Sequence, residues 1–280
     1  MASNAVLITG CSTGIGRATA ERLARRGDRA VYATARRTDA IEDLQQAGCR
    51  TLALDVTSEG SMAAAVETIE AEEGAIGALV NNAGYSQSGA VETIPMDSLR
   101  AQFETNVFGL VRMCQLVLPG MRGQGEGRIV NVSSMGGKLT FPGGGAYHAT
   151  KHAVEAISDA LRFEVAGFGI QVSIIEPGLI KTSFADTAVD SVNREEGPYA
   201  HFNGAVAEAT AGAYDGPFGK LGGGPDDVAR AIERALTARR SKTRYPVTAS
   251  ARVFMTQRRL LPDRAWDRVV GTSFPRPAPK

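Results

Sequence analysis

The sequence predicts an α/β fold, a doubly wound parallel sheet of about seven strands with helices on both faces. Short apolar runs alternate with longer segments of helical period through most of the chain, the order that a parallel sheet requires. The strand runs are nearly continuous in apolar residues, as expected when both faces of a sheet are covered. Neither an internal repeat nor a linker interrupts the pattern, so residues 1–280 are interpreted as one domain.

The first half of the chain alternates strands with helices. Strands are expected where apolar residues follow one another without a break, at 5–9, 29–34, 50–56 and 77–82. Helices are expected where small and apolar residues recur at helical spacing, at 15–27, 41–48 and 61–74. Gly27 ends the first helix, because glycine after the last periodic residue is a common stop signal.

The second half continues the alternation and then loosens. Helix, strand, helix and strand are expected in that order at 96–118, 128–134, 146–169 and 170–177. Residues 186–224 are rich in glycine, alanine and small polar residues, and such an irregular stretch is typical of a functional loop, here a substrate lid. The chain ends with a helix, a strand and a basic tail, at 226–240, 243–248 and 250–280.

Composition narrows the class of protein. Apolar residues make up 43% and charged residues 22% of the chain, and the net charge is +1, which is ordinary for a globular protein and indicates no general nucleic-acid partner. Cys11, Cys49 and Cys114 are scattered without disulfide or zinc spacing, which favours a reducing, cytoplasmic compartment. The N-terminus lacks signal-peptide character, and no apolar run approaches the ~20 residues of a transmembrane helix.

Charge is distributed unevenly. Residues 238–280 carry eleven Lys or Arg against two acidic residues, whereas residues 1–237 carry twenty against twenty-eight. In the tail, arginines alternate with apolar residues, namely Val253, Phe254, Leu260, Leu261 and Trp266. We expect this segment to pack against the acidic body or another subunit. Peripheral contact with an anionic membrane is the alternative.

A glycine-rich loop follows the first strand. ITGCSTGIG at 8–16 contains Gly10, Gly14 and Gly16 and opens the first helix. Such a loop lets the backbone approach a pyrophosphate, which then lies at the helix N-terminus. The spacing is T-G-x-x-x-G-x-G rather than G-x-G-x-x-G, and a glycine turn without a ligand is the alternative. In its strand–loop–helix context we interpret it as a dinucleotide site.

The end of the second strand indicates which dinucleotide. NAD-binding folds usually place an acidic residue there, about 20 residues past the glycines. TARRT at 34–38 has Arg36 and Arg37 instead, and guanidinium groups bind a 2′-phosphate that a carboxylate would repel. Ser12 could add a hydroxyl. NADP(H) is therefore favoured over NAD(H), which stays as an alternative cofactor. A further alternative is that both arginines are solvated and bind no ligand.

Polar residues also end the third and fourth strands. Asp55 of LDVT could contact the adenine, or it could cap the helix that begins near Ser58. NNAG at 81–84 places small and polar residues beside the same edge.

The stretch YHATKH at 147–152 holds the candidate chemistry. Tyr147 and Lys151 are i and i+4 on the expected helix, so they share a face. A lysine ammonium favours the phenolate form of a neighbouring tyrosine, which can then exchange a proton with an alcohol or carbonyl oxygen. Ser134, at the end of the fifth strand, offers a hydroxyl to the same oxygen. The pair alone would be ordinary helix surface.

TGCSTGIG, NNAG, Asn106, Ser134, YHATK and EPG at 176–178, in this order and spacing, resemble the short-chain dehydrogenase/reductase family. The resemblance is close over residues 5–185. It implies a Rossmann domain and a catalytic tetrad. Tyr147 would be the acid/base, Ser134 would orient the carbonyl, Lys151 would hold the nicotinamide ribose, and Asn106 would keep a water in the proton relay.

The resemblance also implies cofactor contacts and an activity. Pro177, Gly178 and the residues to Thr182, including Ile180, would line the nicotinamide pocket. The expected cofactor-binding set is Gly10, Ser12, Thr13, Gly14, Ile15, Gly16, Arg36, Arg37, Asp55, Val56, Asn82, Ala83, Gly84, Tyr147, Lys151, Pro177, Gly178, Ile180 and Thr182. The chain looks most like branches that act on steroids, retinoids and other lipophilic alcohols. A homodimer or homotetramer is usual in the family.

The predicted function is hydride transfer between NADP(H) and a secondary alcohol or ketone, or an aldehyde. The alternative is a binding protein that senses NADP(H) without catalysis, although such proteins commonly lose the tyrosine or lysine. An apolar pocket is expected from the aromatic residues of the lid, Phe184, Tyr199, Phe202, Tyr214 and Phe218.

His148 and His152 have a spacing that can bind zinc. They point about 100° away from the catalytic pair on a helix and lack a third ligand, so we expect helix surface or a subunit interface and no metal.

Overall fold

The computed structural model describes residues 3–192, 196–214 and 219–277, with the side chain of Tyr214 left out. Within these residues seven parallel strands form one sheet in the order β3-β2-β1-β4-β5-β6-β7. The strands are β1 (Val6–Ile8), β2 (Val31–Ala35), β3 (Arg50–Ala53), β4 (Ala78–Asn81), β5 (Gly127–Val132), β6 (Ile170–Pro177) and β7 (Arg244–Val247). The predicted doubly wound parallel fold is confirmed.

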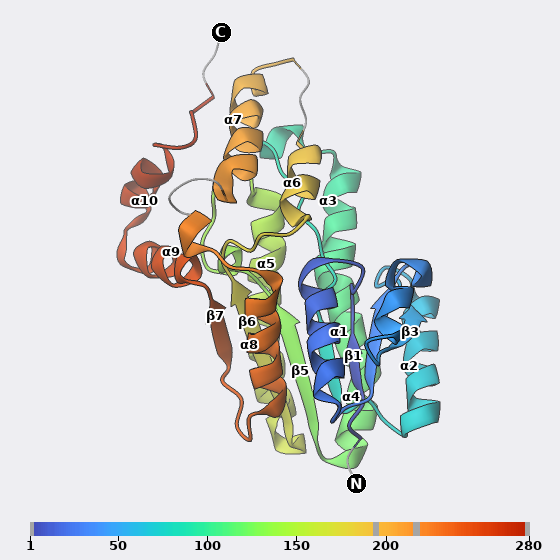
Figure 1. Cartoon of the computed structure of the whole chain (residues 1–280). Helices are drawn as coiled ribbons and strands as arrows, with labels where there is room; N and C mark the ends of the chain where they lie inside the picture. Colours follow the sequence, from blue (N-terminus) through green and yellow to red (C-terminus); the bar gives the residue numbers. More distant parts are fainter. Residues whose placement is uncertain (1–2, 193–195, 215–218, 278–280) are drawn as a thin grey trace.

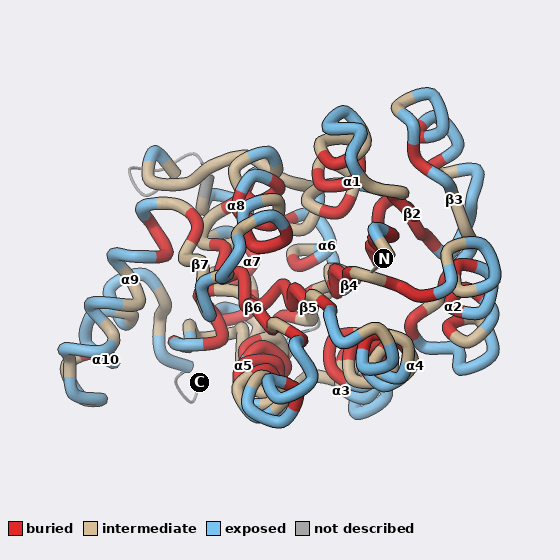
Figure 2. The backbone as a smooth tube through the Cα atoms, turned by 90° about the horizontal axis from the view of Figure 1, so that it is seen from below, coloured by how far each residue is buried: buried red, intermediate tan, exposed pale blue. Residues whose placement is uncertain are grey.

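Helices cover both faces of the sheet (Figure 1). The ten α-helices of the described residues are α1 (Gly14–Arg26), α2 (Glu59–Glu73), α3 (Met96–Phe103), α4 (Gly109–Gln124), α5 (Gly145–Val165), α6 (Phe184–Asp190), α7 (Ala200–Ala211), α8 (Pro225–Thr237), α9 (Ala249–Leu260) and α10 (Asp263–Val270). Viewed along the sheet, α1 and α8 lie on one side, and α2, α4 and α5 lie on the other (Figure 2).

Each face of the sheet has its own apolar core. One core joins the sheet to α1 and α8 through side chains such as Leu23 and Ile232. The other joins it to α2, α4 and α5 through side chains such as Ile69, Val117 and Val154. Strand side chains alternate between the two cores, so Val6 and Ile8 face the first and Leu7 the second. This two-sided burial is why the strand sequences are apolar at successive positions.

Three expectations about local structure are corrected. Residues 41–48, expected as α-helix, lie mostly in the 3₁₀ segment Thr38–Gln45. The helix expected at 96–118 continues to Gln124 and contains a π-helical segment, Glu104–Phe108. Much of the lid region 186–224, expected to be irregular, is helical in α6 and α7. Its small residues give a weak hydrophobic period, so packing rather than pattern specifies these helices.

The strand order determines where a ligand-binding crevice can form at the edge of the sheet. The connections run outward from β1 to β3 and then outward from β4 to β7, so the loops after β1 and β4 diverge. Ligands bind at such a switch point, beyond the carboxyl ends of the strands. In Figure 1, α6 and α7 lie beyond one end of the sheet, and α9 and α10 lie beside them. None of the described helices is long and apolar enough to cross a membrane.

We predict that Gly16→Ala destabilises the protein by about 1–3 kcal/mol, the usual effect of overpacking. A Cβ at Gly16 would penetrate the carbonyl oxygen of Gly10 and lie 2.5 Å from Nδ2 of Asn82. Urea denaturation measures the change. Gly60→Ala in α2 is the control, since a Cβ there meets no atom within 4 Å and should stabilise by up to about 1 kcal/mol. Equal effects of the two substitutions would contradict the packing role of Gly16.

Candidate active site

A cavity of about 1150 Å³ lies at the carboxyl ends of the strands. Most of the residues predicted to bind the cofactor or to act in catalysis line it, namely Gly10, Ser12, Thr13, Gly14, Ile15, Arg36, Asp55, Val56, Asn82, Ala83, Gly84, Ser134, Tyr147, Lys151, Pro177, Gly178, Ile180 and Thr182. Gly16, Arg37 and Asn106 are outside this lining. The fold thus brings into one cavity residues that are up to 172 positions apart, from Gly10 to Thr182.

The glycine-rich loop has the conformation that phosphate binding needs. Gly10 and Gly14 have φ values of +73° and +59°, which residues with a Cβ rarely adopt. Thr13 precedes α1 in an extended conformation, and its side chain makes no capping hydrogen bond to the helix. The first N–H groups of α1 therefore remain available beside the cavity, where they can bind an anion.

Asn82 connects the loop to β4. Its Nδ2 donates to the carbonyl oxygens of Thr9 and Gly10, each at 3.0 Å. The Thr9 hydroxyl accepts from the backbone N–H groups of Asn82 and Ala83. The NNAG motif therefore holds the ends of β1 and β4 together at the switch point, and the same residues form part of the cavity wall.

The two arginines after β2 have different surroundings. Arg36 lines the cavity. Arg37 lies outside the lining and forms an ion pair with Asp39 at 3.4 Å, with 78% of its side chain exposed. No acidic residue of the described chain lines the cavity next to Arg36 on the β2 loop. This arrangement fits a negatively charged group at Arg36.

The alternative roles of Asp55 are partly resolved. Ser58, not Asp55, is the N-cap of α2 and accepts from the backbone N–H of Ser61. Asp55 instead accepts hydrogen bonds from the backbone and hydroxyl of Thr57, at 2.9 and 2.7 Å. Asp55 therefore stabilises its own turn while lining the cavity.

Lys151 is buried next to Tyr147, the candidate acid/base. Its side chain is 5% exposed, Nζ donates to the carbonyl oxygen of Val132 at 2.9 Å, and Nζ lies 5.7 Å from the centre of the Tyr147 ring. Burial lowers the pKa of Lys151 to about 8, and the negative charge of Glu155 opposes this lowering. Ser134, which ends the strand extension after β5, accepts from the backbone N–H of Gly136 at 3.0 Å.

Asn106 lies behind the cavity in the π-helical segment. Its Nδ2 donates to the Tyr85 carbonyl at 2.9 Å and to the Thr150 hydroxyl at 3.1 Å, and its Oδ1 accepts from the Tyr85 N–H. Asn106 thereby connects the α3–α4 helix, the loop after β4, and α5 beside Lys151. In this structure its side chain makes structural contacts, and its role in a proton relay stays a prediction.

The expectation that His148 lies on the helix surface is wrong. Its imidazole is 8% exposed and lines the cavity. Nδ1 is 3.1 Å from the Gly136 carbonyl oxygen, and the ring lies 5.6 Å from that of Tyr147. A Cβ on Gly136 or on Gly144 would collide with the imidazole. The helical period places His148 off the face of Tyr147, but the loop before α5 folds over that side.

His152 is exposed, and its Nδ1 lies 2.9 Å from the His148 carbonyl oxygen. Among the described residues, no group of three or more His, Cys, Asp or Glu side chains could hold a metal.

The substrate side of the cavity has an aromatic wall that sequence reasoning missed. Phe141, before α5, packs against Phe254 of α9 and Trp266 of α10, with ring centres 5.8 and 5.9 Å apart. Trp266 Nε1 donates to the Thr140 carbonyl oxygen at 3.1 Å. All three rings line the cavity, together with Val269, Val270 and Phe274. The mixed apolar and basic pattern of the tail was visible in the sequence, but its place over the cavity was not.

The aromatic residues of the lid behave differently from the expectation. Phe184 lines the cavity and packs against Tyr147 with ring centres 5.3 Å apart. Tyr199 and Phe202 are outside the lining and belong to an apolar cluster that borders the cavity through Val206 and Phe274. Phe218 and the side chain of Tyr214 lie outside the described part of the chain. Residues 186–224 contribute mainly small residues to the lining, including Ala188, Ala209 and Ala213.

Comparison with known proteins adds independent information. The sequence profile of the short chain dehydrogenase family matches residues 4–193. The chain is 38% identical over 266 residues to an oxidoreductase of Escherichia coli K12, YbbO, covering 95% of this chain and 93% of that protein. It is 34% identical to the NADPH-dependent 3-dehydrocapnine reductase of Ornithobacterium rhinotracheale, covering 94% of each. A serine dehydrogenase structure complexed with NADP⁺ superposes with a TM-score of 0.75 at 29% identity, over 87% of this chain and 94% of that one.

We predict that His148 makes the protein sensitive to acid. Burial lowers the pKa of His148 to about 4 from its ordinary 6.5, so the unfolded chain takes up a proton that the folded chain resists. Stability should fall as pH drops from 6.5 towards 4. Between pH 7.5 and 5.0, the unfolding free energy of the wild type should fall by about 2 kcal/mol more than that of His148→Gln. Urea denaturation at both values tests this.

The control is His152→Gln, which removes an exposed imidazole one turn further along α5. This variant should keep most of the wild-type dependence on pH, because the charge of His152 is the smallest cause of the lowered pKa of His148. An equal loss of stability in His148→Gln and the wild type would show that burial of His148 does not drive the acid response.

Proposed function

The chain belongs to the short-chain dehydrogenase/reductase family, and from this we propose that it is an NADP(H)-dependent oxidoreductase acting on a lipophilic alcohol or carbonyl compound. The observation that carries the proposal is the convergence of Tyr147, Ser134 and Lys151 on the cavity that also contains the glycine-rich loop and Arg36. When bound there, the nicotinamide supplies the hydride chemistry.

The protein side chains have separable roles in this proposal. The Tyr147 hydroxyl gives a proton to the carbonyl oxygen during reduction, and the Tyr147 phenolate takes the proton from the alcohol during oxidation. The Ser134 hydroxyl donates a hydrogen bond to the same oxygen and fixes its position. Lys151, held by the Val132 carbonyl, places an ammonium beneath Tyr147 that stabilises the phenolate. In this proposal Lys151 also holds the ribose of the nicotinamide half.

Two features support NADP(H) over NAD(H). Arg36 and Ser12 line the cavity after β2 and in the glycine-rich loop, so a guanidinium and a hydroxyl lie where a 2′-phosphate would be recognised. No acidic side chain on the described β2 loop lines the cavity to repel that phosphate. One relative is named as NADPH-dependent, and one similar structure contains NADP⁺.

The walls of the cavity support a lipophilic substrate. Phe141, Phe184, Phe254 and Trp266 surround the side of the cavity next to Tyr147. Apolar surface of this kind is buried favourably by apolar ligand groups. The relative from Ornithobacterium rhinotracheale is named as reducing a dehydro compound, which agrees with reduction of a carbonyl. We therefore favour a ketone or aldehyde that carries an apolar chain or ring.

We predict NADPH oxidation in the presence of apolar ketones or aldehydes, with lower kcat/KM for small polar ones. Tyr147→Phe should lower kcat by about 10²–10⁴-fold, the usual contribution of a general acid/base, and leave NADPH affinity nearly unchanged. Absorbance of NADPH over a panel of carbonyl compounds measures both effects. A Tyr147→Phe variant as active as the wild type would contradict the assigned role. Tight NADPH binding without turnover on any compound would favour a sensor.

We predict that Arg36→Asp weakens NADPH binding about 10–100-fold, since a charge-assisted hydrogen bond is lost and a repulsive carboxylate is gained. Binding of NADH should change little or improve. Arg37→Asp is the matched control, because Arg37 is exposed and outside the cavity lining, and its effect on the NADPH to NADH preference should be smaller. An unchanged preference in Arg36→Asp would refute recognition of the 2′-phosphate at this residue.

A further inference from the structure

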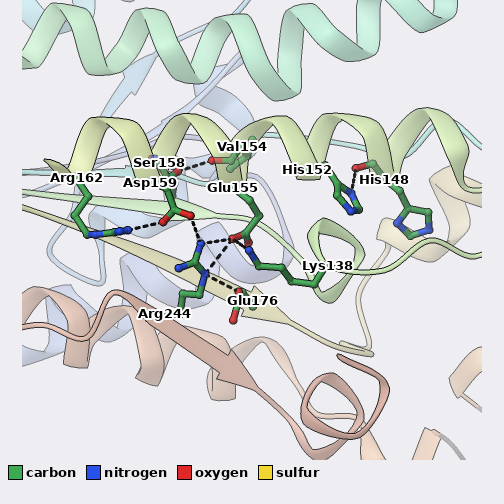
Figure 3. Close-up of polar contacts among 11 residues, drawn as sticks. Lys138, His148, His152, Val154, Glu155, Ser158, Asp159, Arg162, Glu176 and Arg244 are labelled. Atoms are coloured by element: carbon green, nitrogen blue, oxygen red, sulfur yellow. Dashed lines mark hydrogen bonds and ion pairs between the residues drawn. The ribbon is translucent and has the colours of Figure 1, made fainter. Parts of the chain in front are cut away.

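A charge cluster lies where α5, β6 and β7 meet, next to the candidate active site (Figure 3). We use this name for Lys138, Glu155, Asp159, Glu176 and Arg244. Arg244 of β7 lies at its centre and contacts Glu155 at 3.1 Å, Asp159 at 2.6 Å and Glu176 at 3.3 Å. Lys138 reaches Glu155 from the segment after β5, at 2.8 Å. None of the roles assigned above uses these residues.

The two glutamates of the cluster are deeply buried, whereas Lys138, Asp159 and Arg244 are partly exposed. Glu155 is 4% exposed and Glu176 is 2% exposed. Both contacts of Glu155 use Oε2, whereas its buried Oε1 has no hydrogen-bond partner in the described part of the chain. Burying a carboxylate in such a place is costly unless it is paired and hydrogen-bonded, and Lys138 and Arg244 supply that pairing for Glu155.

Glu155 lies next to Lys151 in the fold. The two residues are i and i+4 on α5, so their side chains share one face of the helix. Both are buried, and both pack beside Gly137, where a Cβ would lie 2.9 Å from the Lys151 carbonyl oxygen and 2.8 Å from Cγ of Glu155. Because both residues are buried, solvent screens the attraction between their charges only weakly. Glu155 is the group whose charge supports the ammonium form of Lys151.

We infer that Glu155 is a positioning residue that keeps Lys151 in its ammonium form, with Lys138 and Arg244 holding its carboxylate in place. The inference rests on the proposed function for its catalytic meaning, since that function requires a charged Lys151 beneath Tyr147. A lysine in this apolar site would otherwise lose its proton near neutral pH. Glu155 counteracts that loss from one helical turn away, without touching substrate or cofactor.

Other charged and titratable groups surround Lys151 and Glu155 and also influence the electrostatic potential there. Glu176 of β6 lies across Arg244 from Glu155, and burial together with the charge of Glu155 raises its pKa to about 7. Asp159 lies one turn further along α5 and is paired with Arg244 and Arg162. On the other side of Lys151, Tyr147 and the neutral His148 belong to α5. Of the acidic groups in the cluster, Glu155 is the nearest to Lys151 along the helix.

The test is a direct titration of Lys151 in the ligand-free protein, by NMR of ¹³C-labelled lysine, with the signal assigned by its loss in Lys151→Arg. Glu155→Gln should move the Lys151 midpoint down by about one pH unit. Gln keeps the size of the side chain and an oxygen for Lys138 and Arg244. Lys138→Gln should move the midpoint up, because it leaves the Glu155 charge less neutralised. Shifts of opposite sign cannot arise from general loosening of the structure.

Asp159→Asn is the matched control, the same carboxylate-to-amide change one turn further from Lys151, and it should move the midpoint by less than about 0.3 unit. A Glu155→Gln midpoint within that range of the wild type would overturn the inference. If Glu155→Gln does not fold, the absence of an upward shift in Lys138→Gln overturns the inference.

NADPH affinity between pH 7 and 9.5 is the second readout. The wild type should bind more weakly as pH rises past the Lys151 midpoint, and Glu155→Gln should lose affinity at a pH about one unit lower. An NMR shift without NADPH binding in any protein would leave the coupling intact and refute the proposed function instead.

Discussion

The packing of α5 against the end of β5 is the constraint on which the site depends. One hydrogen bond, from Lys151 Nζ to the Val132 carbonyl, fixes a cation at the carboxyl end of a central strand. Tyr147 then lies one turn before it and Glu155 one turn after it on the same helix. Because a helix repeats every 3.6 residues, these three side chains form a line that runs from the cavity into the charge cluster.

Burying that cation has consequences for the surrounding structure. A lysine in an apolar site tends to lose its proton unless a nearby negative charge favours the ammonium form. Charged residues from α5, β6, β7 and the segment after β5 come together next to Lys151. The edge strand β7 contributes to this cluster through Arg244. Polar contacts of Asn106 secure the same helix from the other side, through Thr150. Polar contacts therefore hold α5 in place, through Lys151, Thr150 and Glu155. Apolar side chains such as Phe184 cover Tyr147 on the cavity side.

The C-terminal segment completes the cavity. Its aromatic side chains pack on Phe141 and line the substrate side, whereas most of its arginines remain exposed. The tail packs on the body of the domain as expected, but charge attraction is not the cause. Aromatic contacts and a hydrogen bond from Trp266 attach it. Among the described residues, the ion pair of the tail arginines at 250–277 is internal, between Arg258 and Asp263.

The sequence by itself determined the order of strands and helices, the glycine-rich loop, and the pairing of Tyr147 with Lys151, because these depend on local periods and on contacts within a few residues. It also placed Ser134 and Arg36 at strand ends, where a parallel sheet must direct them to one edge. Only the tertiary structure decided that His148 is buried, that Arg36 and Arg37 differ, and that Phe254 and Trp266 roof the cavity. Those outcomes depend on which segments, distant in sequence, cover each side chain, and helical or strand period carries no information about the covering segment.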